Sequence, residues 1–255
     1  MSTMTRKKKI YEGKAKIIYE GDSATTVVQH FKDDITAFNS KKREILKGKG
    51  ALTNLLSEHF MTGLESVGIK THFIKRLNVR EQLVKRCEII PLEVVVRNLV
   101  AGSMAKRLKI PEGTHLPFPL VEFYFKNDDL GDPLVTESHA VAFNWASLEE
   151  LNEIKKLALQ TNRFLSKRLV SVNIRLVDFK IEIGRVLGKK EKSLVIADEI
   201  SPDSCRLWEF NTGKKLDKDI FRQNLGNVMD GYADLASRLG LIDNTFTDFG
   251  LNYED

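Results

Sequence analysis

The chain has 255 residues, of which 42% are hydrophobic and 29% are charged, and its formal net charge is +5 at pH 7. A chain of this length can bury a large apolar core and can form one sizeable domain or two lobes in close contact. The composition is ordinary for a globular protein and excludes wholesale disorder. No apolar run approaches the roughly 20 residues that span a bilayer, so we expect no membrane partner.

The N-terminal stretch MSTMTRKKKIYEG carries a basic cluster, but only Ile10 and Tyr11 follow it before polar residues resume. A secretory signal needs an apolar segment at that place, so we expect a cytoplasmic protein. Cys87 and Cys205 are the only cysteines. They are too few for a disulfide framework, and their spacing is not that of metal ligands.

The positive charge suits two kinds of partner, a nucleic acid or an anionic small molecule. The basic residues are mostly dispersed among acidic ones, and only 6–9 and 41–50 are dense. The chain has neither zinc-finger spacing nor an RNP-like run of glycine with aromatic and basic residues. Composition alone leaves both alternatives open.

The first part of the chain predicts mainly β-strands. The stretches KAKIIYEG and ATTVVQHF are short β-branched or aromatic runs with a turn at Gly21-Asp22 between them. Helical spacing of apolar residues predicts a helix over about 51–67 that ends at Gly68. KTHFIKRL and EQLVKRCEII predict two more strands. Pro91 is predicted to break this run, so that LEVVVRN begins another strand.

Helices and strands alternate in the second part. AGSMAKRL predicts a turn and a short helix, and the stretch from 113 predicts a strand followed by an acidic loop. Ser147 and Glu150 form a capping box at the start of a long helix. IRLVDFKIEIGRV and SLVIADEI predict a hairpin closed by LGKKEK, and one last helix is predicted over 218–239. We therefore expect a β-rich lobe over 1–88, a mixed lobe over 89–240 and an acidic tail over 241–255.

The strand LVDFKIEIGR carries the clearest pattern. Its charged residues alternate with its apolar ones: Asp178, Lys180 and Glu182 against Val177, Phe179, Ile181 and Ile183. Alternate strand residues point to opposite faces, so one face is predicted to be apolar and the other charged. If this strand pairs with LVIADEISPD, the charged face lies near Asp198 and Glu199, and Mg²⁺ bound with a nucleotide takes such carboxylates. An amphipathic surface strand is the alternative.

Other stretches place cations beside glycine. YEGKAK puts Lys14 and Lys16 beside Gly13, where the backbone can approach a ligand closely and lysine can meet phosphate; an exposed turn is the alternative. In VVVRNLVAGS, Arg97 precedes a predicted helix start and suits a phosphate or carboxylate; a surface arginine beside a plain helix cap is the alternative. The acidic stretch FKNDDLGDPL does not indicate a function by itself, because Asp and Gly are common in ordinary turns.

Several kinds of catalysis lack support. The five histidines show no paired-ligand spacing, so we interpret them as structural or exposed. The chain has no GxSxG elbow and no reactive-cysteine context, so covalent serine or cysteine catalysis is not indicated.

Taken together, these stretches resemble the SAICAR synthetase family of purine biosynthesis. The matching segments run in family order from about residue 10 to 240: YEGKAK, FKDDITAFN, KGKGALTN, PLEVVVRNLVAGS, FYFKNDDLGDPL, RLVDFKIEIG, ADEISPDSCRLWE and LDKDIFR. The resemblance implies an α+β fold in which a kinase-like β-rich N-terminal lobe lies over a larger mixed α/β lobe, with ATP in the cleft.

The resemblance also implies a reaction. Family members join L-aspartate to the carboxylate of 5-amino-1-(5-phospho-D-ribosyl)imidazole-4-carboxylate (CAIR), giving SAICAR, ADP and phosphate, with ATP and Mg²⁺. An acyl phosphate is the expected intermediate, because a carboxylate must be activated before an amine can attack it. The implied partners are these small molecules and a second copy of the chain, without nucleic acid or membrane.

Site residues follow by matched motif. The resemblance implies that the ATP phosphates, adenine and ribose are bound by Lys14, Ala15, Lys16, Lys85, Arg86, Cys87 and Glu93. It implies that Mg²⁺ is held by Glu182 and Asp198. The residues implied to act in catalysis are Lys180, Asp178 and Arg206. The ribonucleotide is implied to be bound by Arg97, Ser103, Lys126, Asp132, Arg206, Lys218 and Arg222. Our choice for the aspartate subsite is Asp34, Thr36 and Asn39.

Two other functions compete with this one. A phosphotransferase with kinase-like lobes would use ATP without aspartate, but the HRDxxxxN motif of the kinase catalytic loop is absent. A basic nucleic-acid-binding protein would show steep salt dependence, but acidic clusters would interrupt its binding surface.

Overall fold

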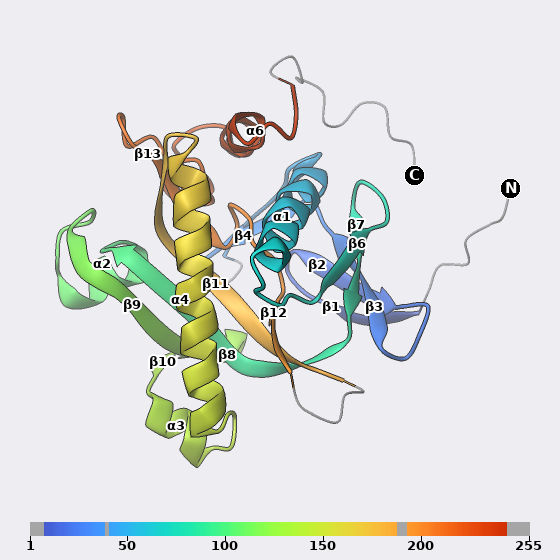
Figure 1. Ribbon diagram of the computed structural model, residues 1–255. Coiled ribbons are helices and arrows are strands. Elements are labelled where there is room, and N and C mark those ends of the chain that lie inside the picture. The colour runs from blue at the N-terminus through green and yellow to red at the C-terminus, as the bar shows by residue number, and fades with distance from the viewer. Residues whose placement is uncertain (1–7, 39–40, 188–192, 244–255) are drawn as a thin grey trace, which may run out of the picture.

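The computed structural model describes residues 8–38, 41–187 and 193–243, which form an α+β fold (Figure 1). Three sequence-based predictions fall outside these ranges: the loop at 188–192, Asn39 and the tail from 244 onward. Within the described ranges, no helix is both long enough and apolar enough to cross a membrane.

One five-stranded antiparallel sheet comes from the first third of the chain. Its strands, in spatial order, are β1 (Lys9–Glu12), β2 (Lys16–Glu20), β3 (Thr26–Phe31), β7 (Glu81–Lys85) and β6 (Phe73–Arg76). A separate hairpin follows β3 and consists of β4 (Asp34–Ala37) and β5 (Lys42–Ile45). The predicted strands in KAKIIYEG and ATTVVQHF are confirmed as β2 and β3.

A six-stranded sheet carries most of the remaining strands. Its order is β10 (Leu134–Val135), β9 (His115–Phe125), β8 (Cys87–Leu99), β11 (Ile174–Val186) and β12 (Leu194–Ala197), with β13 (Cys205–Glu209) pairing to β11. The predicted hairpin is confirmed as β11 and β12. The long helix α4 (Leu148–Val170) lies across this sheet (Figure 1) and begins at the predicted capping box of Ser147 and Glu150.

The other helices surround the two sheets. They are α1 (Lys49–Ser66), α2 (Gly102–Leu108), the 3₁₀ turn η1 (Asp128–Leu130), α3 (Glu137–Ala142), α5 (Asp219–Gln223) and α6 (Val228–Arg238). The predicted helix over 51–67 is confirmed as α1.

Pro91 does not break its strand, so that prediction was wrong. β8 runs through Pro91 because the strand carries a bulge there: Glu182 of β11 lies opposite Glu93, while Gly184 lies opposite Ile89. A bulge leaves a residue outside the regular ladder, so the missing N–H of proline costs no hydrogen bond. The Pro91 carbonyl still accepts from the Lys126 N–H at 3.1 Å.

The single last helix over 218–239 was also predicted wrongly, because two helices occupy this stretch. Asn224 ends α5 with φ of 55° and Gly226 has φ of 126°, both outside the right-handed helical region. The Asn227 side chain then caps the start of α6 by accepting from the Met229 N–H at 3.0 Å.

The predicted apolar face of β11 is correct for three residues and wrong for Val177. Phe179, Ile181 and Ile183 lie in the main apolar core, whereas Val177 packs with Leu99 in a second, smaller apolar cluster. The register with β13 shifts between Leu176 and Asp178, and this irregularity changes the face to which Val177 points.

One continuous apolar core lies against the six-stranded sheet, and Phe73 of β6 in the five-stranded sheet packs against it. It joins buried residues of α1, α4 and α6 to buried residues of β8 and β11. Backbone bonds connect the sheets as well: the His72 N–H donates to the Ile196 carbonyl at 2.8 Å, and the Ile196 N–H donates to the Lys70 carbonyl at 3.0 Å. The sheets are therefore fixed against each other where β12 meets the segment that leads into β6.

A buried ion pair anchors the loop between β12 and β13. Lys49, the first residue of α1, is 1% exposed and pairs with Asp203. The Tyr232 hydroxyl of α6 donates to the same carboxylate at 2.6 Å. Three segments distant in sequence thus meet at Asp203.

We predict that Lys49→Met lowers the free energy of unfolding by about 3–5 kcal/mol, because it leaves the Asp203 carboxylate buried without its cation. Urea denaturation monitored by circular dichroism measures the change. The matched control is Lys47→Met, since Lys47 is exposed, and it should change stability by less than about 0.5 kcal/mol. A loss in Lys49→Met no larger than that of the control would contradict this role for the pair.

Candidate active site

A cavity of about 1010 Å³ lies where the two sheets meet. The turn after β1, the connection from β7 to β8, and the strands β8, β11 and β13 all contribute to its wall. The predicted nucleotide, metal, catalytic and ribonucleotide residues all line it: Lys14, Ala15, Lys16, Lys85, Arg86, Cys87, Glu93, Arg97, Ser103, Lys126, Asp132, Asp178, Lys180, Glu182, Asp198, Arg206, Lys218 and Arg222.

The predicted aspartate subsite is less well assembled. Thr36 lines the cavity. Asp34 is buried on the β4–β5 hairpin, where its carboxylate pairs with Arg43 at 2.5 Å and with Lys32 at 3.5 Å. The Asp34 carboxylate is therefore already neutralised by two cations.

The carboxylates of Glu182 and Asp198 come together because of strand register. Glu182 of β11 lies opposite Ala197 of β12, so Asp198 follows directly beyond the end of that pair. The Lys126 Nζ contacts Glu182 Oε2 at 2.5 Å. Lys16 pairs with Asp198 and also contacts Glu199 Oε1 at 2.8 Å. Each buried carboxylate thus has a lysine partner.

Lys180 lies between these carboxylates. Its Nζ contacts Glu93 Oε1 at 2.6 Å and lies 3.9 Å from Glu182 Oε1. Glu93 lies opposite Glu182 across β8 and β11, so the lysine holds two neighbouring acids. Burial opposes its charge, but the charges of Glu93, Glu182 and Asp198 outweigh burial and raise the pKa of Lys180.

The two predicted metal ligands differ in their proton affinity. Burial, together with the nearby charge of Asp198, raises the pKa of Glu182 above its usual range. Burial would also raise the pKa of Asp198, but Lys16 and Lys180 outweigh it and hold this pKa at about 2. The two carboxylates therefore repel each other, and a further positive charge between them would be favourable.

This donor set fits Mg²⁺ bound together with a nucleotide. Within the described ranges, no three His, Cys, Asp or Glu residues gather closely enough to hold a metal ion by themselves. Mg²⁺ commonly takes one or two carboxylates and completes its shell with phosphate oxygens and water. Glu182 and Asp198 are the residues that would hold it.

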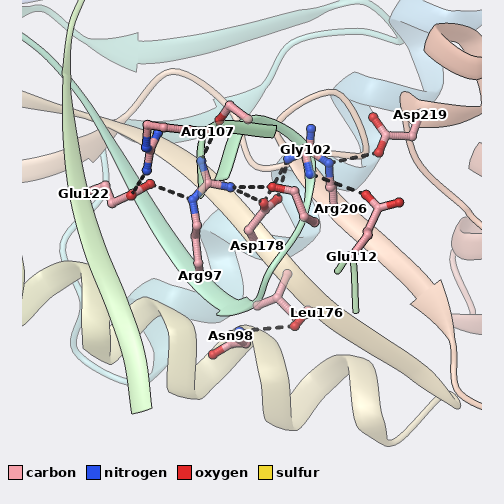
Figure 2. Close-up of polar contacts among 12 residues, drawn as sticks. Arg97, Asn98, Gly102, Arg107, Glu112, Glu122, Leu176, Asp178, Arg206 and Asp219 are labelled. Atoms are coloured by element: carbon pink, nitrogen blue, oxygen red, sulfur yellow. Dashed lines mark hydrogen bonds and ion pairs between the residues drawn. The ribbon is translucent and has the colours of Figure 1, made fainter. Parts of the chain in front are cut away.

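A chain of arginines and aspartates occupies the neighbouring part of the cavity (Figure 2). Asp178 of β11 lies opposite Arg97 of β8 on one side and opposite Arg206 of β13 on the other. Its carboxylate accepts from Arg97 Nη1 at 2.7 Å and from Arg206 Nη1 at 2.8 Å. Asp219 of α5 then accepts from Arg206 Nε at 2.9 Å and from Arg222 Nη1 at 2.6 Å. The guanidinium groups are thereby fixed in position.

Arg97 is the most enclosed of these arginines. It is 2% exposed, and its Nη2 donates to the Ser103 hydroxyl at 3.0 Å and to the Tyr124 hydroxyl at 3.1 Å. Its Nε donates to Glu122 at 2.6 Å (Figure 2). Each of its three nitrogens is thus bonded within the protein.

Gly102 leaves the space that Arg206 occupies. Its φ is +54°, and a Cβ at this position would lie 2.4 Å from Nη2 and 2.6 Å from Cζ of Arg206. Glycine adopts this left-handed backbone without strain, and its missing side chain allows the guanidinium group to approach.

Two further groups at the cavity have distinct electrostatics. Lys14, on the turn after β1, reaches Asp128 of η1 at 2.7 Å. Burial lowers the pKa of Lys218 to about 8, and Arg222 and Lys49 add to this while Asp203 opposes it.

The backbone of the β7–β8 connection is only partly available to a ligand. The Arg86 N–H donates to the Thr25 carbonyl at 2.8 Å, and the Arg86 carbonyl accepts from the Leu187 N–H at 3.2 Å. Of the three residues expected to face adenine, Arg86 thus has its backbone groups engaged. The Lys85 N–H is engaged as well, because it donates to the His72 carbonyl at 2.7 Å, and the contact of this connection with adenine stays a prediction.

Sequence reasoning missed several residues that line or support the cavity. Glu122 and Tyr124 alternate on β9 and hold Arg97, a pattern visible in VEFYF. Asp203 and Asp219 stand inside the matched segments ADEISPDSCRLWE and LDKDIFR but were given no role. The histidines were interpreted as structural or exposed, yet His72 lines the cavity while being 4% exposed. Its sequence position gives no signal for this.

Comparison with known proteins agrees with the geometry. The family model described as SAICAR synthetase matches residues 9–239. A phosphoribosylaminoimidazole-succinocarboxamide synthase of Dinoroseobacter shibae is 62% identical over 239 residues, which are 94% of this chain and 94% of that protein.

Solved structures give the same result. The crystal structure of phosphoribosylaminoimidazole-succinocarboxamide synthase from Ehrlichia chaffeensis has a TM-score of 0.90 and 53% identity, covering 93% of this chain and 100% of that one. A SAICAR synthetase solved in complex with ADP has a TM-score of 0.86 and 45% identity, covering 90% of this chain and 96% of that one.

The fold and the family match place the protein among the ATP-dependent ligases of purine biosynthesis. Within that class, the chain belongs to the SAICAR synthetase family. The α+β fold expected from the sequence is confirmed.

We predict that Gly102→Ala lowers kcat/KM of the ligase reaction at least about tenfold, because the new Cβ displaces the Arg206 guanidinium. Steady-state assays measure the loss. The matched control is Gly113→Ala, which has the same left-handed strain at φ +87° but meets only Trp208, at 3.6 Å. Equal losses of activity in the two variants would show that backbone strain, and not Arg206, is responsible.

Proposed function

We propose that this ligase joins L-aspartate to the carboxylate of CAIR, using ATP and Mg²⁺ and passing through an acyl phosphate. The observation that carries the proposal is that two different groups of side chains occupy neighbouring parts of one cavity. Lysines and carboxylates suited to phosphate and metal gather at Lys16, Lys180, Glu182 and Asp198, and fixed guanidinium groups gather beside them around Arg206.

In the first step, the γ-phosphoryl group of ATP moves to a carboxylate oxygen of CAIR, giving ADP and the acyl phosphate. Lys14, Lys16 and Lys180 hold the phosphate oxygens, whose charge they offset. Mg²⁺ held by Glu182 and Asp198 would supply further neutralisation of the phosphate oxygens. Each lysine is now paired to a carboxylate and would exchange that partner for phosphate.

In the second step, the aspartate nitrogen attacks the acyl carbon. The bond between this carbon and the phosphate oxygen breaks, phosphate leaves, and the nitrogen loses a proton as the amide forms. Arg206, Lys218 and Arg222 hold the ribonucleotide through its phosphate and carboxylate oxygens, since fixed guanidinium groups bind such oxygens bidentately. Lys126 and Asp132 line the same pocket.

Arg97 supports this site in a different way. Because its nitrogens are already bonded to Glu122, Asp178, Ser103 and Tyr124, it holds Asp178 and Ser103 in place for the ribonucleotide. Asp178 in turn orients Arg206.

Nucleotide use is supported by the related SAICAR synthetase that was solved with ADP. A nucleic-acid-binding protein is less compatible with the structure, because the cationic side chains line a cavity and are interleaved with carboxylates.

The division of the chain into lobes, its oligomeric state and its location are also part of the proposal. The five-stranded sheet ends at Lys85 and the six-stranded sheet begins at Cys87, which supports a division into two lobes at residue 86, close to the predicted boundary between 88 and 89. A homodimer is expected from the family resemblance and a cytoplasmic location from the N-terminal sequence, and we assign the net positive charge to the binding of anionic substrates.

The proposed reaction predicts that ADP release depends on both co-substrates. The pure protein is incubated with MgATP, CAIR and L-aspartate, and ADP is followed while each substrate is omitted in turn. Omission of aspartate should reduce steady ADP formation to background. ADP formed equally fast without aspartate would contradict the ligase reaction and favour phosphotransfer alone.

The metal assignment predicts that Glu182→Gln and Asp198→Asn raise the Mg²⁺ concentration needed for half-maximal rate and cut turnover by about 10²-fold or more. Removing one of the two carboxylates would weaken the binding of the ion. Glu153→Gln is the control, because Glu153 is exposed on α4. An unchanged Mg²⁺ requirement in both variants would exclude these ligands.

A further inference from the structure

Asp217 is a buried carboxylate that none of the proposed reaction steps uses. It is 0% exposed and lies in the segment LDKDIFR, two residues before α5 begins. Its Oδ2 accepts from the Leu207 N–H at 2.7 Å, and its Oδ1 accepts from the Asp219 N–H at 2.7 Å. Each carboxylate oxygen therefore holds a backbone group, one on β13 and the other at the start of α5.

These bonds form a closed ring with Arg206. Arg206 directly precedes Leu207 on β13, and its Nε donates to the Asp219 carboxylate at 2.9 Å (Figure 2). A path of bonds therefore leaves the Arg206 backbone through Leu207, crosses the Asp217 carboxylate, and returns to the Arg206 guanidinium group from the side of α5. The position of this guanidinium group relative to its own strand thus depends on Asp217.

A second guanidinium group depends on the same arrangement. Asp219 also accepts from Arg222 Nη1 at 2.6 Å, and both arginines line the cavity. Because Asp219 is the first residue of α5, any shift of the helix start changes where its carboxylate holds Arg206 and Arg222. Asp217 fastens that helix start to β13.

Stability alone does not explain a carboxylate at position 217. Burial and the nearby charge of Asp219 raise the pKa of Asp217 to about 7, although its two backbone bonds and Arg206 oppose the shift. A neutral Ser or Asn also caps a helix start and carries no charge to bury. Among side chains of this size, only a carboxylate offers two acceptor oxygens and no donor. The acid is therefore explained by the need to hold both N–H groups at once.

We propose that Asp217 is a positioning residue for the ribonucleotide: it fixes Asp219 against β13 and so directs the guanidinium groups of Arg206 and Arg222 at the anionic groups of this substrate. The inference rests on the proposed function for the identity of the ligand. A displaced guanidinium group loses the bidentate geometry with which arginine binds phosphate and carboxylate. Nucleotide binding should be spared, because Lys16 and Lys180 lie on β2 and β11.

The first test is calorimetric titration of the whole Asp217→Asn protein with CAIR and, separately, with ADP. Asparagine has the same shape but directs an NH₂ group at one of the two N–H groups, so one bond of the ring is lost. CAIR should bind about tenfold more weakly than to the wild-type chain, while the affinity for ADP stays within about twofold. A smaller folded fraction would lower the number of sites and leave the affinity unchanged. Wild-type affinity for CAIR in this variant would overturn the proposal.

Asp217→Ser keeps the test valid if the asparagine variant does not fold. Serine retains a cap for the Asp219 N–H, buries no charge and is too short to hold the Leu207 N–H as well. We expect CAIR to bind at least about threefold more weakly and ADP to bind as before. A serine variant that binds CAIR like the wild-type chain would also overturn the proposal.

The matched control is Asp33→Asn. Asp33 also accepts from two backbone N–H groups, those of Gly48 at 3.3 Å and Gly50 at 2.9 Å. It is not among the described residues that line the cavity. Its replacement should leave the affinity for CAIR within about twofold of the wild-type value. Equal weakening in Asp33→Asn and Asp217→Asn would show a general effect of losing such a bond and would overturn the specific role of Asp217.

Nitrogen-15 spectra of the arginine Nε–H groups test the geometry without any substrate. The Arg206 signal is identified by its loss in Arg206→Lys, and its bond to Asp219 should slow exchange of this proton with water. In Asp217→Asn the signal should shift and exchange at least about threefold faster. An Arg206 signal identical to that of the wild-type chain would overturn the proposal.

Failure of the two proposals can be told apart. If the wild-type chain did not bind CAIR, the proposed function would fail, and the Arg206 signal would still decide whether Asp217 positions this side chain. If the wild-type chain bound CAIR and Asp217→Asn bound it equally well, only the role of Asp217 would fail.

Discussion

The charge balance at the end of β12 is the constraint on which the rest of the site depends. Asp198 is buried beside Glu182, and neither carboxylate could remain ionised there without the lysines that meet them. Lys16 comes from the five-stranded sheet, Lys180 from β11 and Lys126 from the end of β9. The same electrostatic requirement that stabilises these acids therefore draws separate segments to one point and leaves cations where phosphates would bind.

Strand register explains why the second half of the site is equally ordered. Asp178 lies at the centre of β11 between two neighbouring strands, and each neighbour places an arginine opposite it. The arginine of β8 is enclosed, and that of β13 reaches the cavity because Gly102 has no side chain. The Asp178 carboxylate thus links the buried Arg97 to the Arg206 guanidinium group, which can contact a ligand.

Much of this was predictable from local pattern, and the exceptions have physical reasons. Period-2 alternation in VDFKIEIG identified a strand with a charged face, and matched motifs identified residues that share one cavity. The course of β8 through Pro91 and the orientation of Val177 depend on bulges, which arise from pairing between strands and leave no local signature. The position of His72 depends on the meeting of two sheets, and the backbone bonds of Arg86 depend on Thr25 and Leu187, which are distant in sequence. Such facts are tertiary and cannot be read from spacing.

The buried pair of Lys49 and Asp203 also limits how this enzyme can vary. A change at either residue alone strands a charge in the interior, whereas a joint change to apolar residues of similar volume removes both charges together. Asp203 lies on the wall of the cavity, and Lys49 begins a helix more than 150 positions earlier in the sequence. We therefore expect these two positions to be substituted together. The start of α1 is thereby coupled, through one buried ion pair, to the loop that carries Asp203 at the cavity.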